Sequence, residues 1–221
     1  RKLLACAVDD ELISRVPRVR FLKTEEAEIR YLSSRQCELL LSDQSSPLWN
    51  LMLFVGLYTG MRIGELFALH WEDIDFERRV LTVRHSLVRG VMGSPKSRRV
   101  RHVPLAPELH DRLAPLAQPS GRVFKRRDGR EFNHRQASYH LSKIAKRVGV
   151  GHVHWHMLRH TFATQLVGAG VPLRAVQVLL GHSDYRITER YAHVGEGSLR
   201  DAVAVLDACF GKLSPECGQH L

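Results

Sequence analysis

The chain has 221 residues, enough for one sizeable domain with its own hydrophobic core. Its formal net charge of +10 and pI of about 9.9 favour a polyanionic partner and argue against a polycationic one. Arginine supplies 26 of the 33 basic residues, and its planar guanidinium suits bidentate contacts to phosphate. A merely basic surface is the alternative that composition leaves open.

Cysteine usage and hydropathy indicate a reducing, cytoplasmic location. Neither CxxC spacing nor the density of a disulfide framework is seen among the four cysteines, Cys6, Cys37, Cys209 and Cys217. The longest apolar stretch, around residues 48–58, is too short to span a bilayer, and no export signal opens the chain. We therefore expect no membrane partner. Because the chain begins at Arg1 rather than methionine, we expect a further N-terminal portion.

The first third of the chain predicts an arm followed by helices. Residues 1–22 are charged and interrupted by Pro17, which is typical of a linker or arm. Thr24, followed by two glutamates, is a plausible helix start because a side-chain oxygen and early acids suit unpaired N–H groups. Pro47 predicts the start of a buried helix that runs through Tyr58, and Gly60 fits its left-handed exit. A second short helix should carry residues 62–69.

From residue 79 onward the pattern becomes β-favouring. Two β-favouring stretches, 80–82 and 100–103, are separated by Gly90, Gly93 and Pro95, which predicts a small antiparallel sheet with a hairpin that carries Lys96. Helices are expected at about 107–116, 134–147, 156–167 and 172–180, with one or two short strands near 122–124.

A last amphipathic helix is predicted after residue 196. Ser198 and Asp201 form a capping-box pair, Gly211 supplies the exit, and apolar residues line one face. Its apolar face can fold onto its own domain or dock on a neighbouring molecule. We therefore expect a mainly α-helical α+β fold with a small antiparallel sheet, divided into an arm (1–22), a main domain (23–195) and a terminal helix with tail (196–221).

Two arginines each lie three residues from a partner on the same helix face: Arg62 with Glu65, and Arg159 with His156. The carboxylate can orient the first guanidinium, and two arginines on two helices can converge on one anion. For Arg62 and Glu65, a surface ion pair is the alternative. His156 and His160 have a metal-ligand spacing, but Arg159 stands between them, and a fixed cation beside a dication is unfavourable. We expect no metal site, and interpret His160 as a packed or supporting histidine.

The predicted hairpin concentrates basic residues. Lys96 lies in a turn rich in Gly, Pro and Ser, and Arg98, Arg99 and Arg101 follow it. We interpret these arginines as contacts to DNA phosphates. For Lys96 itself, a solvated basic loop is the alternative to a chemical role.

A histidine and two tyrosines follow the last apolar helix of the main domain. His182 comes directly after a glycine, where a side chain can reach a site from a helix boundary, although a lone histidine there is usually structural. Tyr191 lies nine residues later in a polar segment, and Tyr185 competes for the same role. A tyrosine with its ordinary pKa of about 10 needs a base or neighbouring cations to act as a nucleophile.

In this order, these residues closely resemble the tyrosine recombinase (phage integrase) family. The resemblance runs from about Thr24 to Val194 through the phrases YTGMRIGEL, SPKSRRVRHVPL, HMLRHTFATQL and LLGHSDYRITERYAHV. It implies the catalytic fold of DNA breaking and rejoining enzymes. It also implies a role for each matching residue. Arg62 and Arg159 match the two catalytic arginines, Glu65 matches the following acid, and Lys96 matches the hairpin lysine, the proton donor. His156 matches the first motif histidine, the partner that accepts or relays the tyrosine proton, His182 matches the position occupied by His or Trp, and Tyr191 matches the nucleophile.

The resemblance implies a site-specific recombinase or integrase that cleaves and rejoins double-stranded DNA through a 3′-phosphotyrosine, without metal, ATP or cofactor. The missing phosphate loop agrees, because GMRIG lacks the GxxxxGK[ST] pattern. It further implies four protomers on two duplexes, in a DNA-associated setting such as a mobile genetic element. A type IB topoisomerase and a catalytically silent DNA-binding regulator are the alternatives.

Overall fold

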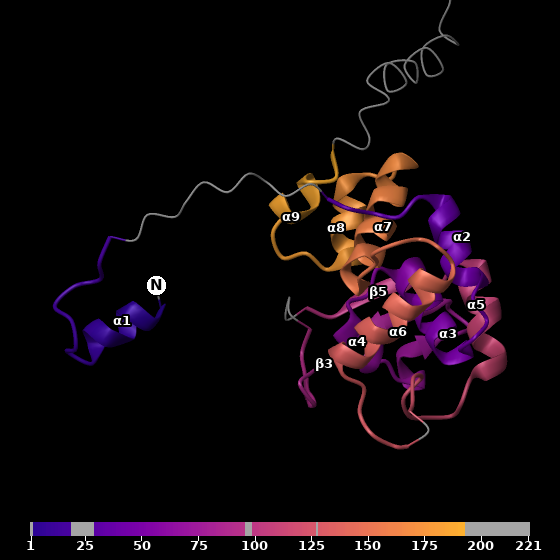
Figure 1. Cartoon of the computed structure of the whole chain (residues 1–221), viewed down its shortest axis with the longest axis horizontal. Helices are drawn as coiled ribbons and strands as arrows, with labels where there is room; N and C mark the ends of the chain where they lie inside the picture. The colour runs from indigo at the N-terminus through magenta and orange to yellow at the C-terminus, as the bar shows by residue number, and fades with distance from the viewer. Residues whose placement is uncertain (1, 19–28, 96–98, 127, 193–221) are drawn as a thin grey trace, which may run out of the picture.

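The computed structural model describes residues 2–18, 29–95, 99–126 and 128–192 (Figure 1). Outside these ranges lie the predicted helix start at Thr24, Lys96 and Arg98 of the predicted hairpin, and the predicted terminal helix over residues 198–211. Within the predicted arm, residues Lys2–Asp9 form a short helix, α1, where no helix was expected.

The core is built around two buried helices, α3 (Pro47–Thr59) and α7 (Trp155–Gly168), which pack against each other. The helices α2 (Ser34–Ser42), α4 (Ile63–Phe67) and α5 (Pro107–Leu113) also contact α3, as expected for a helix that is apolar on all sides. Gly60 ends α3 with φ of +61°, a conformation that glycine adopts without strain. The predicted start at Pro47 and exit at Gly60 are confirmed.

The predicted antiparallel sheet is present and has three strands in the order β1 (Ile74–Asp75), β2 (Val80–Val83) and β5 (Arg101–Pro104). In the register of β2 and β5, Leu81 pairs with Val103 and Val83 pairs with Arg101. These four side chains are buried, while their neighbours along both strands are more exposed. Arg101 therefore lies on the core face of the sheet.

A separate two-stranded ribbon precedes the residues around Lys96, where a single hairpin was expected. It consists of β3 (Ser86–Val88) and β4 (Val91–Gly93). The two residues between the strands, Arg89 and Gly90, both have positive φ, which matches the twist of a tight hairpin turn. β3 packs against α4, so the ribbon is attached to the helix that follows Arg62.

The other predicted helices of the main domain are confirmed. They are α5 with the short helix η2 (Ala114–Leu116), α6 (His134–Arg147), α7, and α8 (Leu173–Leu180). Two α-helices of the main domain were not predicted: α2, although Ser33 and Gln36 form its capping box, and α9 (Arg186–Glu189). Near residues 122–124 the described chain has an isolated bridge between His70 and Arg122 rather than a strand.

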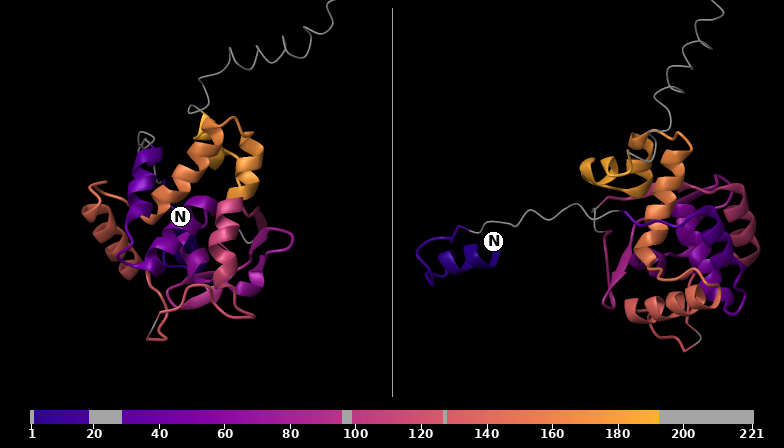
Figure 2. Two further views of the ribbon diagram at one scale, coloured as in Figure 1. Left: turned by 90° about the vertical axis from the view of Figure 1, so that its right-hand side faces the viewer. Right: turned by 45° about the horizontal axis from the view of Figure 1, so that its top comes forward.

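The helices α7, α8 and α9 gather at one end of the main body, above α3 and α4 (Figures 1 and 2). The short helix η1 (Trp71–Asp73) leads from α4 to the sheet. In the described ranges, no helix is both long and apolar enough to cross a membrane. The expected fold class, mainly helical with a small antiparallel sheet, is confirmed.

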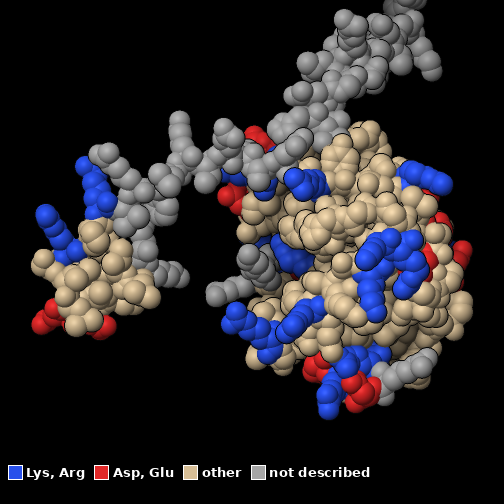
Figure 3. Space-filling model, in the orientation of Figure 1, with Lys and Arg blue, Asp and Glu red and all other residues tan. Residues whose placement is uncertain are grey.

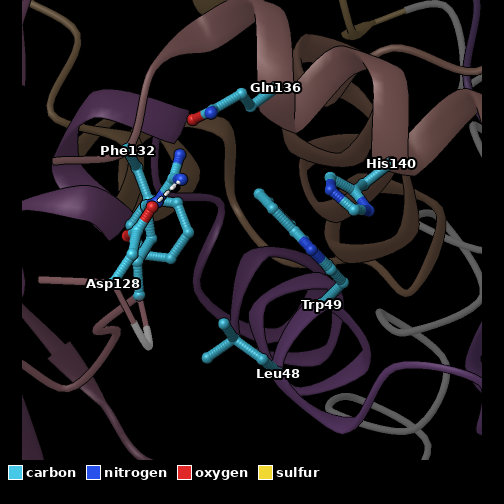
Figure 4. A pocket seen from close by; sticks show the side chains of 7 residues that line it. Leu48, Trp49, Asp128, Phe132, Gln136 and His140 are labelled. Atoms are coloured by element: carbon cyan, nitrogen blue, oxygen red, sulfur yellow. Dashed lines mark hydrogen bonds and ion pairs between the residues drawn. The ribbon is translucent and has the colours of Figure 1, made fainter. Parts of the chain in front are cut away.

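A pocket of about 330 Å³ opens between the start of α3, the loop before α6, and α6 itself (Figure 4). The Trp49 and His140 rings stack in it with centroids 4.5 Å apart, and Arg126 pairs with Asp128 at its edge. None of the site residues predicted from sequence lines this pocket.

Candidate active site

Arg62 and Glu65 form the expected pair at the start of α4. Arg62 is the N-cap of that helix, and its backbone N–H donates to a Glu65 carboxylate oxygen at 2.9 Å. Its guanidinium Nη1 donates to the other oxygen at 3.1 Å. The Glu65 side chain is fully buried, whereas 24% of the Arg62 side chain is exposed. Glu65 thus holds both ends of Arg62 while the guanidinium can still reach a ligand.

Arg101 does not lie on the surface, where a phosphate contact had been expected. Both of its terminal nitrogens donate to the two oxygens of Glu65, at 3.1 and 2.6 Å, and its side chain is 3% exposed. The reason is strand alternation, which places Arg101 on the same face as Val103. A Cβ at Gly181 would lie 2.9 Å from Cδ of Arg101, so the turn before His182 packs directly on this arginine.

The Glu65 carboxylate stays ionised because of its two arginine partners. Burial by itself would raise its pKa, but the hydrogen bonds and charge of Arg101 outweigh burial, and the pKa is held below its ordinary value. The buried Glu65 carboxylate therefore holds Arg62 in place and also links it to β5 through Arg101.

Arg159 is held by two helix ends. It is 1% exposed, and its guanidinium donates to the carbonyl oxygens of Gly60, at 2.7 Å, and Leu180, at 2.6 Å. These carbonyls end α3 and α8, where the helix dipole favours a cation. Burial and then the nearby Arg62 lower the pKa of Arg159 to about 9, so the group remains charged at neutral pH. The two arginines from α4 and α7 therefore lie in one electrostatic neighbourhood.

His182 lies beside both arginines. It is 8% exposed, and its Nδ1 is 2.8 Å from the Thr188 hydroxyl. Burial, followed by the charges of Arg159 and Arg62, lowers the pKa of His182 to about 3. The ring is therefore neutral near pH 7. Its position depends on the glycine before it, because Gly181 ends α8 in the left-handed conformation at φ +66°.

Tyr191 comes just after α9 and turns inward. It is 3% exposed and packs with Val176 and Leu180 of α8. Its hydroxyl is 2.6 Å from Nδ1 of His160 on α7. Burial raises the pKa of Tyr191, while the charges of Arg159 and Arg190 act in the opposite direction.

The structure brings together six of the predicted site residues: Arg62, Glu65, His156, Arg159, His182 and Tyr191. The charge of His156 contributes to the lowered pKa of His182, and its ring lies edge-on to His160 at 4.5 Å between centroids. Of the remaining predicted residues, Arg99 is exposed and Lys96 and Arg98 lie outside the described ranges. Tyr185, the competing tyrosine, is 42% exposed at the start of α9.

Two functional candidates were not recognised from sequence, Arg101 as a buried brace and His160 as the partner of the tyrosine. Alternation along residues 100–103 and the four-residue spacing from His156 were the available signals. Within the part of the chain that the structure describes, no three His, Cys, Asp or Glu side chains are arranged to hold a metal ion.

Comparison with known proteins identifies the family. A model of the phage integrase family matches residues 25–197, most of the chain. The chain belongs to the phage integrase family. Among curated family members, it is 37% identical over 177 residues to the tyrosine recombinase XerC of Bacillus pumilus (strain SAFR-032), covering 72% of this chain and 55% of that protein. It is 35% identical over 189 residues to the XerC of Bacillus licheniformis, covering 77% and 59%. The chain thus spans little more than half the length of these relatives.

Solved integrase structures share the fold. The catalytic domain of bacteriophage HP1 integrase matches with a TM-score of 0.60 at 26% identity, covering 82% of this chain and 98% of that chain. The Tn1549 transposon integrase in complex with transposon right end DNA matches with a TM-score of 0.75 at 24% identity, covering 94% and 76%. XerA recombinase matches with a TM-score of 0.63 at 24% identity, covering 98% and 75%. The latter two likenesses concern the fold alone.

The surface carries the positive charge that the composition predicts. On the face seen in Figure 3, Lys and Arg side chains are spread over the main body, and acidic side chains lie between some of them. The buried Glu65 offsets one of three arginine charges around the site, those of Arg62, Arg101 and Arg159. The candidate active site therefore keeps an excess of positive charge suited to an anion.

Proposed function

We propose that this chain is the catalytic domain of a site-specific DNA recombinase that cleaves and rejoins DNA strands through a phosphotyrosine. Tyr191 is the nucleophile, and it attacks the scissile phosphorus in line. The new bond joins the tyrosine oxygen to phosphorus, and the bond from phosphorus to the 5′ oxygen breaks. The products are a 3′-phosphotyrosine and a free 5′-hydroxyl.

One observation carries this proposal: Arg62 at the start of α4, Arg159 on α7 and His182 after α8 share one electrostatic neighbourhood, and Arg159 also acts on Tyr191. Arg159 acts on the pKa of both Tyr191 and His182, and Arg62 acts on those of Arg159 and His182. If Arg62 only formed a surface ion pair, or His182 were only structural, there would be no reason for Arg62, Arg159 and His182 to lie close enough to affect each other's pKa values.

The excess positive charge stabilises the pentavalent phosphorus. Arg62 and Arg159 are held by Glu65 and by the two helix ends, so they need no reorganisation when negative charge develops. We assign the tautomer of His182 in which Nδ1 accepts from the Thr188 hydroxyl. The neutral ring then carries its proton on Nε2, which donates a hydrogen bond to a phosphate oxygen. Removing one preorganised donor of this kind costs about 2.7–4 kcal/mol of barrier.

Two protons must move. The leaving 5′ oxygen takes one, and the family resemblance assigns its donor as Lys96. The tyrosine gives up the other to a histidine of α7. Because the phosphotyrosine keeps the energy of the original linkage, a 5′-hydroxyl can reverse the attack without ATP. Rejoining to a different strand gives recombination.

The partners follow from the same chemistry. We assign double-stranded DNA as the substrate, on the basis of the net charge and the anion-suited site. We further propose a tetramer on two duplexes as the working assembly, because exchanging strands between two duplexes requires four cleavages.

Trapping the covalent adduct tests the proposal. The chain is incubated with a nicked duplex from which the short 5′-hydroxyl fragment diffuses away, and a denaturing gel detects protein bound to DNA. Tyr191→Phe should abolish the adduct and leave DNA binding intact, whereas Tyr185→Phe should form it normally. An adduct that survives Tyr191→Phe and disappears in Tyr185→Phe would show that the wrong tyrosine was chosen.

Three further measurements separate the alternatives. Cleavage should persist in EDTA, and strong inhibition would restore the metal hypothesis. Recombination between two cognate sites, with little relaxation of an unrelated supercoiled plasmid, distinguishes a recombinase from a type IB topoisomerase. DNA affinity should fall steeply as salt rises, because contacts to phosphate release counterions. Salt-dependent binding with no adduct from the unaltered chain would identify a catalytically silent regulator.

A further inference from the structure

The hydroxyl of Tyr191 is already hydrogen-bonded to a potential base, and that base is His160. Nδ1 of His160 lies 2.6 Å from the hydroxyl oxygen, and the two ring centroids are 5.9 Å apart. His160 follows His156 by four residues on α7, so both rings project from the same face of the helix. His156 is an exposed residue at the start of that helix, whereas His160 is half-buried.

We propose that His160 is a catalytic residue that accepts the phenolic proton of Tyr191 as the tyrosine attacks DNA. This inference rests on the proposed function and names the proton acceptor for the same reaction. The family resemblance implies that His156 accepts or relays this proton, whereas the residue in contact with the hydroxyl is His160. The structure places His156 edge-on to His160, with centroids 4.5 Å apart, where it can contact the phosphate and support the ring of His160.

His160 is neutral and can accept a proton, and its lowered pKa makes it a weak base while the site holds no anion. Burial, followed by the charges of His156 and Arg190, lowers the pKa of His160 to about 4, and His154 and Arg159 act in the same direction. The imidazole is therefore neutral near pH 7. We assign the tautomer in which Nδ1 accepts from the tyrosine hydroxyl and the ring carries its own proton on Nε2.

The same cations make proton transfer depend on DNA. Without an anion in the site, a positively charged His160 would face Arg159 and Arg190, while burial raises the pKa of Tyr191. Both effects keep the proton on the tyrosine. A phosphodiester bound in the site adds a negative charge, which offsets the repulsion between the arginines and a positively charged His160. The nucleophile is therefore activated when its substrate is present.

The proton and bond changes balance in both directions. As the bond from the tyrosine oxygen to phosphorus forms, the phenolic proton moves to Nδ1 of His160. As the bond from phosphorus to the 5′ oxygen breaks, that oxygen takes a proton from the general acid. On rejoining, the attacking 5′-hydroxyl returns its proton to that acid, and His160 returns its proton to the departing tyrosine.

The decisive variant is His160→Asn in the full chain. The asparagine side-chain oxygen can occupy the position of Nδ1 and accept the tyrosine hydrogen bond, but it cannot take a proton at neutral pH. In single-turnover cleavage of the nicked duplex, we expect the rate to fall about 10²- to 10⁴-fold, with DNA affinity unchanged. The rate of the variant should also rise tenfold per pH unit through the neutral range, because hydroxide must then remove the proton.

Chemical rescue separates proton transfer from packing. His160→Gly opens space at the ring, and added imidazole should restore cleavage with a dependence on the concentration of its neutral form. His156→Asn should slow cleavage without rescue by imidazole and without the new pH dependence. His152→Asn, at an exposed position outside the site, should cleave at the unaltered rate.

The outcomes distinguish this inference from the proposed function. If the unaltered chain forms no adduct through Tyr191, the proposed function itself is wrong. If it forms the adduct and His160→Asn cleaves equally fast or faster, His160 merely holds the tyrosine at rest, and the inference is overturned. Rescue of His156 variants but not of His160→Gly would return the role to His156.

Discussion

Replacing Arg101 with methionine tests whether Glu65 depends on its buried partner. The substitution keeps most of the alkyl chain against Gly181 and removes the guanidinium. Two charge-assisted hydrogen bonds to Glu65, at 3.1 and 2.6 Å, are lost, and each is worth about 1.5–3 kcal/mol. Loss of one partner from a buried ion pair costs about 3–5 kcal/mol, because the other charge stays buried. Since Arg62 still donates to the same carboxylate, we expect the lower end, about 3 kcal/mol.

Urea unfolding followed by circular dichroism measures this loss. The midpoint should fall with little change in slope, and the melting temperature should fall by about 6–12 °C for a protein of this size. Acid unfolding should also begin at a higher pH in Arg101→Met. In the unaltered protein the pKa of Glu65 is below its ordinary value, so its contribution is present above the unfolded-state pKa and is lost as pH falls through the folded-state pKa. Without Arg101, burial raises that pKa and moves the loss upward.

Two further variants complete the test. Glu65→Gln combined with Arg101→Met should be less destabilising than the sum of the single substitutions, because no carboxylate is then left buried without this partner. Arg35→Met, which removes an ion pair whose two side chains are 76% and 66% exposed, should cost less than about 1 kcal/mol. If Arg101→Met costs no more than Arg35→Met, the reasoning about a buried charged brace is refuted.

Two other predictions concern the surroundings of the site. A Cβ at Gly64 would lie 2.8 Å from the backbone oxygen of Leu87, so Gly64→Ala should destabilise the protein by about 1–3 kcal/mol and slow cleavage by displacing α4. Gly93 has open space around it, so Gly93→Ala should change the stability by no more than about 0.5 kcal/mol. Equal melting temperatures for the two variants would contradict this prediction. The folded-state pKa of His182, about 3, lies below the ordinary value for histidine, so the unfolded chain binds more protons than the folded protein in the acid range. The free energy of unfolding should therefore fall as the pH drops from about 6 to 4, by at most about 1.4 kcal/mol per pH unit. His182→Gln should flatten this slope in urea titrations and His152→Gln should not; an unchanged slope in His182→Gln would argue against a buried neutral ring.

Much of this protein follows from local sequence. The start of α3 at Pro47 and its end at Gly60 are predicted by the residues themselves, because the backbone preferences of proline and glycine hold in any context. Likewise, the pairing of Arg62 with Glu65 follows from a three-residue spacing, and the phrases around Arg159, His182 and Tyr191 were enough to expect one family and one fold. These features depend on neighbours within a few positions along the chain.

Tertiary structure decided which side chains meet. The basic run around Arg99 and Arg101 reads as one surface loop, yet β5 pairs with β2 in a register that turns Arg101 toward Glu65, 36 residues earlier. Tyr191 reads as an exposed residue, yet α9 turns it inward to His160, 31 residues away. In both cases a buried charge or hydroxyl is stabilised by pairing with a distant partner, which offsets the cost of burial and which no local spacing encodes. Periodicity places a residue on a face, and only packing determines what that face meets.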